Sequence, residues 1–200
     1  NDLGINNHLI MVDDEGDLGN TDRLKRNIAV DNHKKWVEAA KFLGCDSIRV
    51  NAQGEGSMES VSNAAIEGLG SLADFALDYD INVIVENHGG YSSDGKWLLN
   101  VIEKTSRNNI GTLPDFGNFC ISGAWGSTQE ECSNKYDKYL GVKEMMPYAK
   151  SVSAKSYDFD DEGNCMETDF YKMLEIVKKS GYNKYISIEY EGTRLSEYEG

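Results

Sequence analysis

The feature that most constrains the fold of this chain is its regular alternation of short apolar runs with longer segments of helical periodicity. The run Val83-Ile84-Val85 is typical of a buried strand, whereas residues 23–43 carry apolar side chains at helical spacing and stop at Gly44. A strand followed by a helix, repeated along the chain, is typical of βα units around a parallel sheet. The sequence therefore predicts an α/β fold.

The same pattern extends along the whole chain, apart from a polar stretch at 123–133 that is expected to be a loop. Because no linker rich in Pro or Ser and no repeated sequence marks a boundary, residues 1–200 are expected to form a single domain. The predicted strands are 8–12, 47–51, 81–86, 110–115, 149–156 and 185–189, and the predicted helices are 23–43, 58–79, 97–104, 136–145 and a final one capped at Thr168 or Asp169 and ending at Gly181.

Polar side chains gather where the predicted strands end. In closed βα barrels the active site lies at this carboxyl-terminal rim, whereas an open doubly wound sheet binds ligands chiefly at one switch point. Polar residues after nearly every strand therefore favour a (β/α)8 TIM barrel. No GxGxxG motif follows a strand and no GxxxxGK[ST] motif occurs, so the nucleotide-binding folds lose their main support.

The charge of the chain excludes whole classes of partner. With 20 Lys+Arg against 34 Asp+Glu the formal net charge is −14, and no basic cluster is present, which argues against binding to nucleic acid or to anionic membranes. No apolar run is long enough for a transmembrane helix. We therefore expect a folded protein that works on a small molecule.

The cysteines show no spacing typical of a zinc site. Four cysteines could form two disulfides, but a chain of this size does not need them, so free, packed thiols and a cytoplasmic location are expected. The sequence leaves open a signal peptide that would precede Asn1. The four cysteines are Cys45, Cys120, Cys132 and Cys165.

Three carboxylates end predicted strands. Glu86 ends the apolar run at 83–85, where an unpaired buried carboxylate would cost several kcal/mol. It therefore needs a salt bridge or a metal as its partner, unless the strand end leaves it in contact with solvent. Asp115 and Glu189 end two further strands in the same way. Three such carboxylates can converge on one hard divalent cation, such as Mg²⁺ or Mn²⁺.

Four polar residues near the strand ends are candidates for substrate binding. His88 would point to the same side as Glu86 if that strand continued, although it would serve equally well as a loop cap. Lys155 could bind a substrate oxygen or form a buried ion pair. The set is His88, Asn118, Lys155 and Asn51.

Four segments together resemble the sugar phosphate isomerase/epimerase family, which consists of xylose isomerase-like TIM barrels. They occur in order at 85–90 (VENHGG), 113–119 (LPDFGNF), 154–159 (AKSYDF) and 188–192 (IEYEG). The resemblance makes the predicted strands the third to eighth of a barrel, so that the chain would be truncated at both ends. A whole barrel typically needs about 250 residues.

The resemblance also implies a site and a reaction. Glu86, Asp115 and Glu189 match the family's metal-ligating carboxylates for Mn, Mg, Co or Zn, but Ser153 stands where the family has a His ligand. Asn118 stands where relatives often have a second His. The implied enzyme is an isomerase, acting as a sugar or sugar phosphate epimerase or aldose–ketose isomerase through an enediolate. Glu86 and Glu189 would be its acid/base pair.

The sequence leaves two alternative functions open. Ser153 motivates a catalytically silent sugar-binding barrel. A metal-dependent phosphodiesterase or endonuclease of the same superfamily is disfavoured by the small number of histidines and by the net charge of −14. Relatives are commonly dimers or tetramers, and the sequence leaves open whether this protein is a homo-oligomer and whether the incomplete chain is active.

Overall fold

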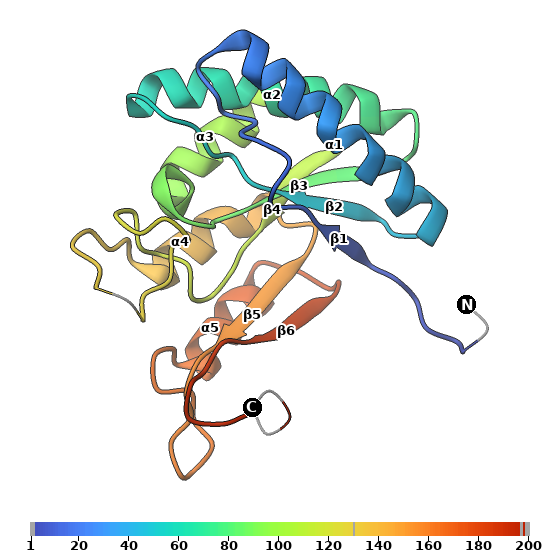
Figure 1. Cartoon of the computed structure of the whole chain (residues 1–200). Coiled ribbons are helices and arrows are strands. Elements are labelled where there is room, and N and C mark those ends of the chain that lie inside the picture. The colour runs from blue at the N-terminus through green and yellow to red at the C-terminus, as the bar shows by residue number, and fades with distance from the viewer. Residues whose placement is uncertain (1–2, 130, 197, 199–200) are drawn as a thin grey trace. The chain divides into compact units, whose positions relative to one another are not determined.

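The computed structural model describes residues 3–129, 131–196 and 198, and it is an α/β structure with parallel strands (Figure 1). The chain forms two compact units, of which the first holds the residues up to 86 with 99–111 and the second holds 87–98 with the residues from 112 onward. The elements are β1 (Leu9–Met11), α1 (Arg23–Leu43), β2 (Ser47–Val50), α2 (Met58–Leu77), β3 (Asn82–Glu86), a 3₁₀ turn (Gly90–Ser93), α3 (Gly95–Thr105), β4 (Ile110–Leu113), α4 (Lys138–Met145), a 3₁₀ turn (Met146–Tyr148), β5 (Val152–Ser156), α5 (Phe170–Lys179) and β6 (Ile186–Tyr190).

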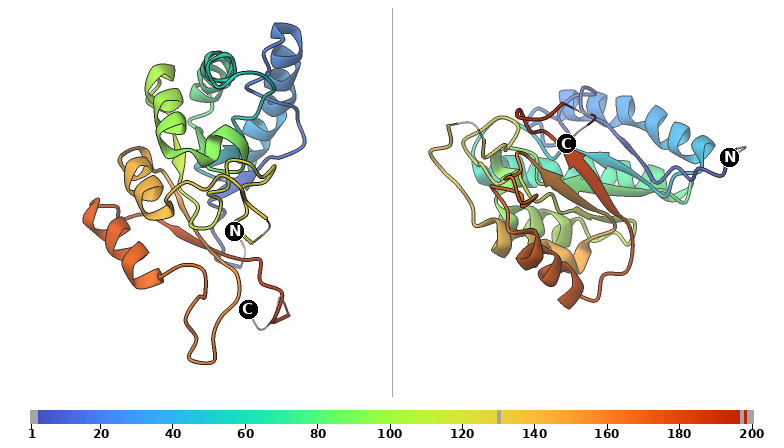
Figure 2. Two further views of the ribbon diagram at one scale, coloured as in Figure 1. Left: turned by 90° about the vertical axis from the view of Figure 1, so that its left-hand side faces the viewer. Right: turned by 90° about the horizontal axis from the view of Figure 1, so that it is seen from below.

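The first unit is a parallel sheet in the order β1-β2-β3-β4, to which β4 contributes its first two residues, Ile110 and Gly111. Helices α1 and α2 lie side by side on one face of the strands β1, β2 and β3 (Figures 1 and 2). Capping residues determine where α1 begins and ends. The Asp22 side chain accepts hydrogen bonds from two backbone N–H groups at the start of α1, and Gly44 ends that helix in the left-handed conformation.

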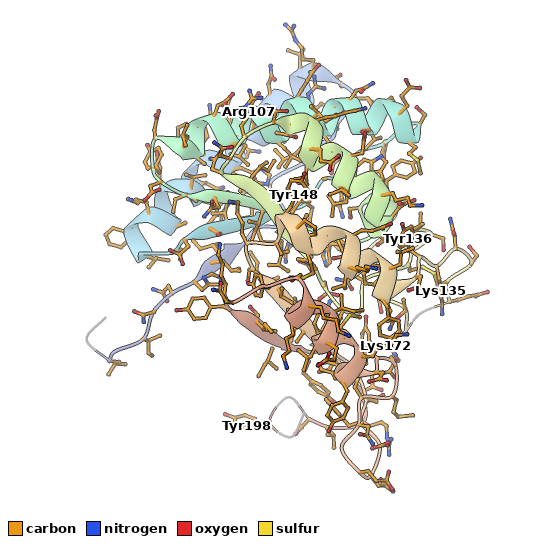
Figure 3. The ribbon with its side chains drawn as sticks, turned by 180° about the vertical axis from the view of Figure 1, so that it is seen from behind. Arg107, Lys135, Tyr136, Tyr148, Lys172 and Tyr198 are labelled. Atoms are coloured by element: carbon orange, nitrogen blue, oxygen red, sulfur yellow. A yellow bond between two sulfur atoms is a disulfide. The ribbon has the colours of Figure 1, made fainter. Side chains whose placement is uncertain are left out.

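The second unit contains a parallel pair of strands, β5 and β6, in which Lys155 lies opposite Glu189. Helices α4 and α5 pack against each other, and Asp169 caps α5. On α5, Lys172 (Figure 3) lies over the ring of Tyr139 at 3.7 Å. Phe170 meets Phe116 edge to face, which anchors the start of α5 beside the loop after β4.

Most predicted elements are confirmed, with corrections at their ends. The helix predicted at 136–145 begins at Lys138 because the Asp137 side chain caps it. The strand predicted at 149–156 begins only at Val152, since the 3₁₀ turn that contains Pro147 runs to Tyr148. The last strand is shifted by one residue, to Ile186–Tyr190.

The prediction of free thiols is wrong for Cys120 and Cys132, which form a disulfide. The loop between them folds back, so that Cys120 pairs with Lys135 in an antiparallel bridge and Ile121 N–H donates to the Asn134 carbonyl. This brings together two cysteines separated by 12 positions. Cys45 and Cys165 are free, as predicted.

No helix in the described part of the chain is long and apolar enough to cross a membrane.

Candidate active site

Asp115 is fully buried at the end of β4, within the second unit. Its Oδ1 accepts hydrogen bonds from the backbone N–H groups of Gly117 at 2.8 Å and Asn118 at 2.9 Å. The pKa of Asp115 is raised to about 6, mainly by burial, with the Lys155 ammonium lowering it and the Glu189 carboxylate raising it. A carboxylate in this state needs positive charge nearby if it is to stay ionised.

The other carboxylate oxygen of Asp115, Oδ2, differs from Oδ1 in its hydrogen bonding. Ser153 lies near enough to lower the pKa of Asp115, but its hydroxyl proton is directed to Glu189. Asp115 Oδ2 is thus buried and accepts no hydrogen bond from the residues that the structure describes.

Asn87 holds the loop that carries Asp115. Its amide donates to the backbone carbonyls of Asp115 and Asn118, each at 3.1 Å, and its Oδ1 accepts from Asp115 N–H at 2.8 Å. The sequence prediction missed this fully buried side chain. The available signal was an amide residue directly after Glu86 at the end of a buried strand, where a loop needs hydrogen bonds.

Glu189 lies on β6 with both carboxylate oxygens engaged by β5. Ser153 Oγ donates to Oε2 at 2.8 Å, and Lys155 Nζ lies 3.2 Å from Oε1. Because residues 153 and 155 project to the same side of a strand, both reach the same carboxylate. Ser153 thus holds a carboxylate in place.

Lys155 connects three parts of the second unit. Its ammonium lies 3.2 Å from Glu191 Oε1 as well as from Glu189, and it donates to Asn118 Oδ1 at 3.2 Å. Gly117 makes room for it, since a Cβ there would lie 3.0 Å from Lys155 Cδ. The predicted candidates Asn118, Lys155 and Glu189 are therefore in direct contact.

Asp115 and Glu189 each offer a carboxylate oxygen, and these two atoms lie within 4.8 Å of one another. Like charges at this separation disfavour joint ionisation unless a cation neutralises them. The donors are hard oxygens, which Mg²⁺ and Mn²⁺ prefer. With Asp115 Oδ2 available, this pair fits a divalent cation.

Glu86 lies in the first unit at the end of β3, where its side chain is only 1% exposed. Arg49 Nε on the neighbouring strand β2 lies 2.8 Å from Glu86 Oε2. Arg49 also pairs with Asp13, which accepts a hydrogen bond from Asn51 Nδ2 at 2.9 Å. Of the two partners considered for Glu86, the first unit therefore supplies the salt bridge, and Asn51 belongs to the same network.

His88 lies in the second unit, with its backbone N–H donating to Ser92 Oγ at 3.0 Å. Its ring contacts that of Trp125 in a tilted arrangement, with the ring centroids 5.4 Å apart. Trp125 is 55% exposed and lies in the loop closed by the disulfide. The sequence prediction did not identify Trp125, because that loop has no periodicity that would indicate its partner.

Comparison with known proteins identifies the fold. The sequence model of the xylose isomerase-like TIM barrels matches residues 2–199. The chain belongs to this family. The family resemblance and the TIM barrel fold are therefore confirmed. None of the curated proteins gives a significant match.

Solved structures with the same fold come from several proteins. The chain resembles 3-keto-D-glucoside 4-epimerase from E. coli in its apo form, with a TM-score of 0.74 at 15% identity over 98% of this chain and 75% of that one. It resembles L-ribulose 3-epimerase with a TM-score of 0.73 at 18% identity, over 98% and 66% of the two chains. A third is a family protein from Mycobacterium smegmatis in complex with magnesium, with a TM-score of 0.69 at 15% identity over 96% and 69%. The chain thus spans two thirds to three quarters of the length of these proteins and is a truncated barrel relative to them.

Proposed function

We propose that this protein is a metal-dependent epimerase or isomerase that acts on a sugar or a sugar phosphate. The observation that carries the proposal is the pair Asp115 and Glu189, with carboxylate oxygens within 4.8 Å of one another. The family supports the reaction class, since solved structures of this fold include 3-keto-D-glucoside 4-epimerase and L-ribulose 3-epimerase. A magnesium complex among them supports the cation.

The residues that would hold the cation are Asp115 and Glu189, together with Glu86, which matches the family's first carboxylate ligand. The ion is Mn, Mg, Co or Zn in the divalent state. When bound, it would polarise two adjacent oxygens of an open-chain sugar and so acidify the carbon between them.

The chain itself would move the protons. One of the two glutamates, Glu86 or Glu189, removes the proton from the carbon beside the carbonyl, which leaves an enediolate on the sugar. The other, in its protonated form, returns a proton to the opposite face of that carbon and completes an epimerisation. An aldose–ketose isomerisation would use the same pair differently.

Four polar side chains are proposed to bind the substrate hydroxyls. Lys155 and Asn118 are supported by their position beside Glu189, and His88 by its contact with Trp125, an exposed aromatic of the kind that packs against sugar rings. Asn51 remains a proposal from the sequence.

The test is proton exchange in D₂O with Mn²⁺ and a panel of ketoses. We expect deuterium to enter the carbon next to the carbonyl of one sugar, and the exchange to be lost in Glu86→Gln and Glu189→Gln. Absence of deuterium with every sugar, or exchange that persists in both variants, would contradict the function.

A second candidate is a silent sugar-binding barrel. It is favoured by Ser153 and Lys155, which engage both oxygens of Glu189 without a metal. Metal analysis separates the two, because sugar binding without a stoichiometric ion would support the silent barrel.

The substrate and the cellular location are also proposals. A small sugar fits the net charge of −14 better than a polyanion does. The cytoplasmic location predicted from sequence is opposed by the Cys120–Cys132 disulfide, since disulfides persist mainly in oxidising compartments. We therefore favour an oxidising compartment.

A further inference from the structure

Glu189 is held by both of its oxygens, although it is a proposed metal ligand. Ser153 Oγ donates to Oε2 at 2.8 Å, and the Lys155 ammonium lies 3.2 Å from Oε1. A divalent cation that binds Glu189 must therefore share this carboxylate with these partners or displace one of them.

Lys155 is built into this position. Its side chain is 2% exposed, and its ammonium, which has three protons, faces the three acceptors Glu189, Glu191 and Asn118, each at 3.2 Å. Gly117 leaves the space that its stem fills, because a Cβ at that position would lie 3.0 Å from Lys155 Cδ. Such a buried ammonium is oriented by the fold rather than by solvent.

The role of Lys155 follows from the negative charges around its ammonium. Asp115, Glu189 and Glu191 bring three negative charges close to one ammonium, and a carboxylate oxygen of Asp115 lies within 4.8 Å of one from Glu189. Lys155 offsets part of this repulsion whether or not an ion is bound. The same positive charge repels a divalent cation placed at Asp115 and Glu189.

We propose that Lys155 is an internal counter-ion that competes with the divalent cation for Glu189, so that this site binds its metal weakly and exchangeably. The proposal rests on the metal site of the proposed function. With a cation at the site, the Lys155 ammonium would give up Glu189 and keep its contacts with Glu191 and Asn118. Ser153 also weakens cation binding. Its hydroxyl donates to Glu189, and it has no imidazole that could serve as a metal ligand.

The experiment is calorimetric titration with Mn²⁺ of the wild type and of Lys155→Met. Removal of a positive charge that lies beside two of the proposed carboxylate ligands is expected to tighten binding by about ten-fold or more, even with strong solvent screening. Lys155→Arg keeps the charge and should stay within about three-fold of the wild type. Lys178→Met, which removes an exposed lysine from α5, is the matched control and should leave the affinity unchanged.

Lys155→Gln serves the same purpose if Lys155→Met fails to fold, since an amide can still donate to Glu189 or Asn118 without carrying charge. Tighter Mn²⁺ binding in either neutral variant supports the proposal, including the case in which the wild type shows none. Equal or weaker binding in the neutral variants overturns it. Loss of deuterium exchange in a protein that binds Mn²⁺ as described would contradict the proposed reaction and leave the role of Lys155 intact.

Discussion

Each unit of this protein places a glutamate at the carboxyl end of a parallel strand and pairs it with a basic side chain from the neighbouring strand. In the first unit, Glu86 is 1% exposed and lies 2.8 Å from Arg49. In the second unit, Glu189 is 28% exposed and lies 3.2 Å from Lys155. A guanidinium is always charged and can hold two carboxylates at once, whereas an ammonium is a compact charge that is more easily displaced.

The difference bears on where the proposed cation would lie. Arg49 neutralises Glu86 within the first unit and also pairs with Asp13. In the second unit, one ammonium faces Glu189 and Glu191, while buried Asp115 lies beside them with its pKa raised to about 6, mainly by burial. The charge of Glu86 is thus offset by Arg49, whereas the second unit has negative charge left for the proposed ion to neutralise.

The largest effect that tests this comparison is expected for Arg49→Met. Removal of the guanidinium takes the Arg49 salt bridge away from the buried Glu86 carboxylate, so the free energy of unfolding should fall by about 3–5 kcal/mol. Urea denaturation measures it. Arg107→Met is the control, because Arg107 (Figure 3) forms an exposed pair with Asp74 and should cost only about 0–1 kcal/mol. An equal loss of stability in the two variants would contradict a special role for the buried Arg49–Glu86 pair.

A smaller loss of stability is expected when the disulfide of the second unit is removed. Cys132→Ser opens a loop closed across 12 positions, which should lower the free energy of unfolding by about 2–3 kcal/mol. Cys165→Ser, at a free thiol, is the matched control. Thiol alkylation of the denatured, unreduced protein should modify Cys45 and Cys165 only. Modification of all four cysteines would show that the disulfide does not form.

The smallest effect is expected in the pH dependence of stability, through His33 in the first unit. Burial lowers the pKa of His33 on α1 below its usual value of 6.5, and its Nδ1 lies 2.7 Å from the Ala29 carbonyl. Since the folded state disfavours the protonated ring, the stability that the neutral ring provides is present above pH 6.5 and declines as the pH falls below it. The slope for one group is at most about 1.4 kcal/mol per pH unit. His33→Gln should reduce this slope, and an unchanged slope in denaturation curves from pH 7.5 to 5 would contradict the assignment.

Much of the fold follows from the sequence because local signals determine it. The limits of α1 were predicted from its periodicity and Gly44, and the carboxylates at the ends of the apolar runs were recognised as unusual. The βα alternation and the ordered motifs together predicted the TIM barrel. These signals act over one helix or one strand at a time.

The missed features depend on residues far apart in the sequence. The pairing of Cys120 with Cys132 requires the loop between them to fold back, and the contact of His88 with Trp125 depends on the same aperiodic loop. The pairing of Arg49 with Glu86 follows from the register of β2 and β3, which the sequence of one strand does not contain. Only the assembled sheet reveals such partners.

The central claim is that Asp115 and Glu189 hold a divalent cation, and Mn²⁺ titration of Asp115→Asn tests it most directly. Asp161→Asn, at an exposed position of the same unit, is the matched control for the lost charge. We predict one Mn²⁺ bound per chain in the wild type and in Asp161→Asn, and no detectable binding in Asp115→Asn. Unchanged binding in Asp115→Asn would contradict the account.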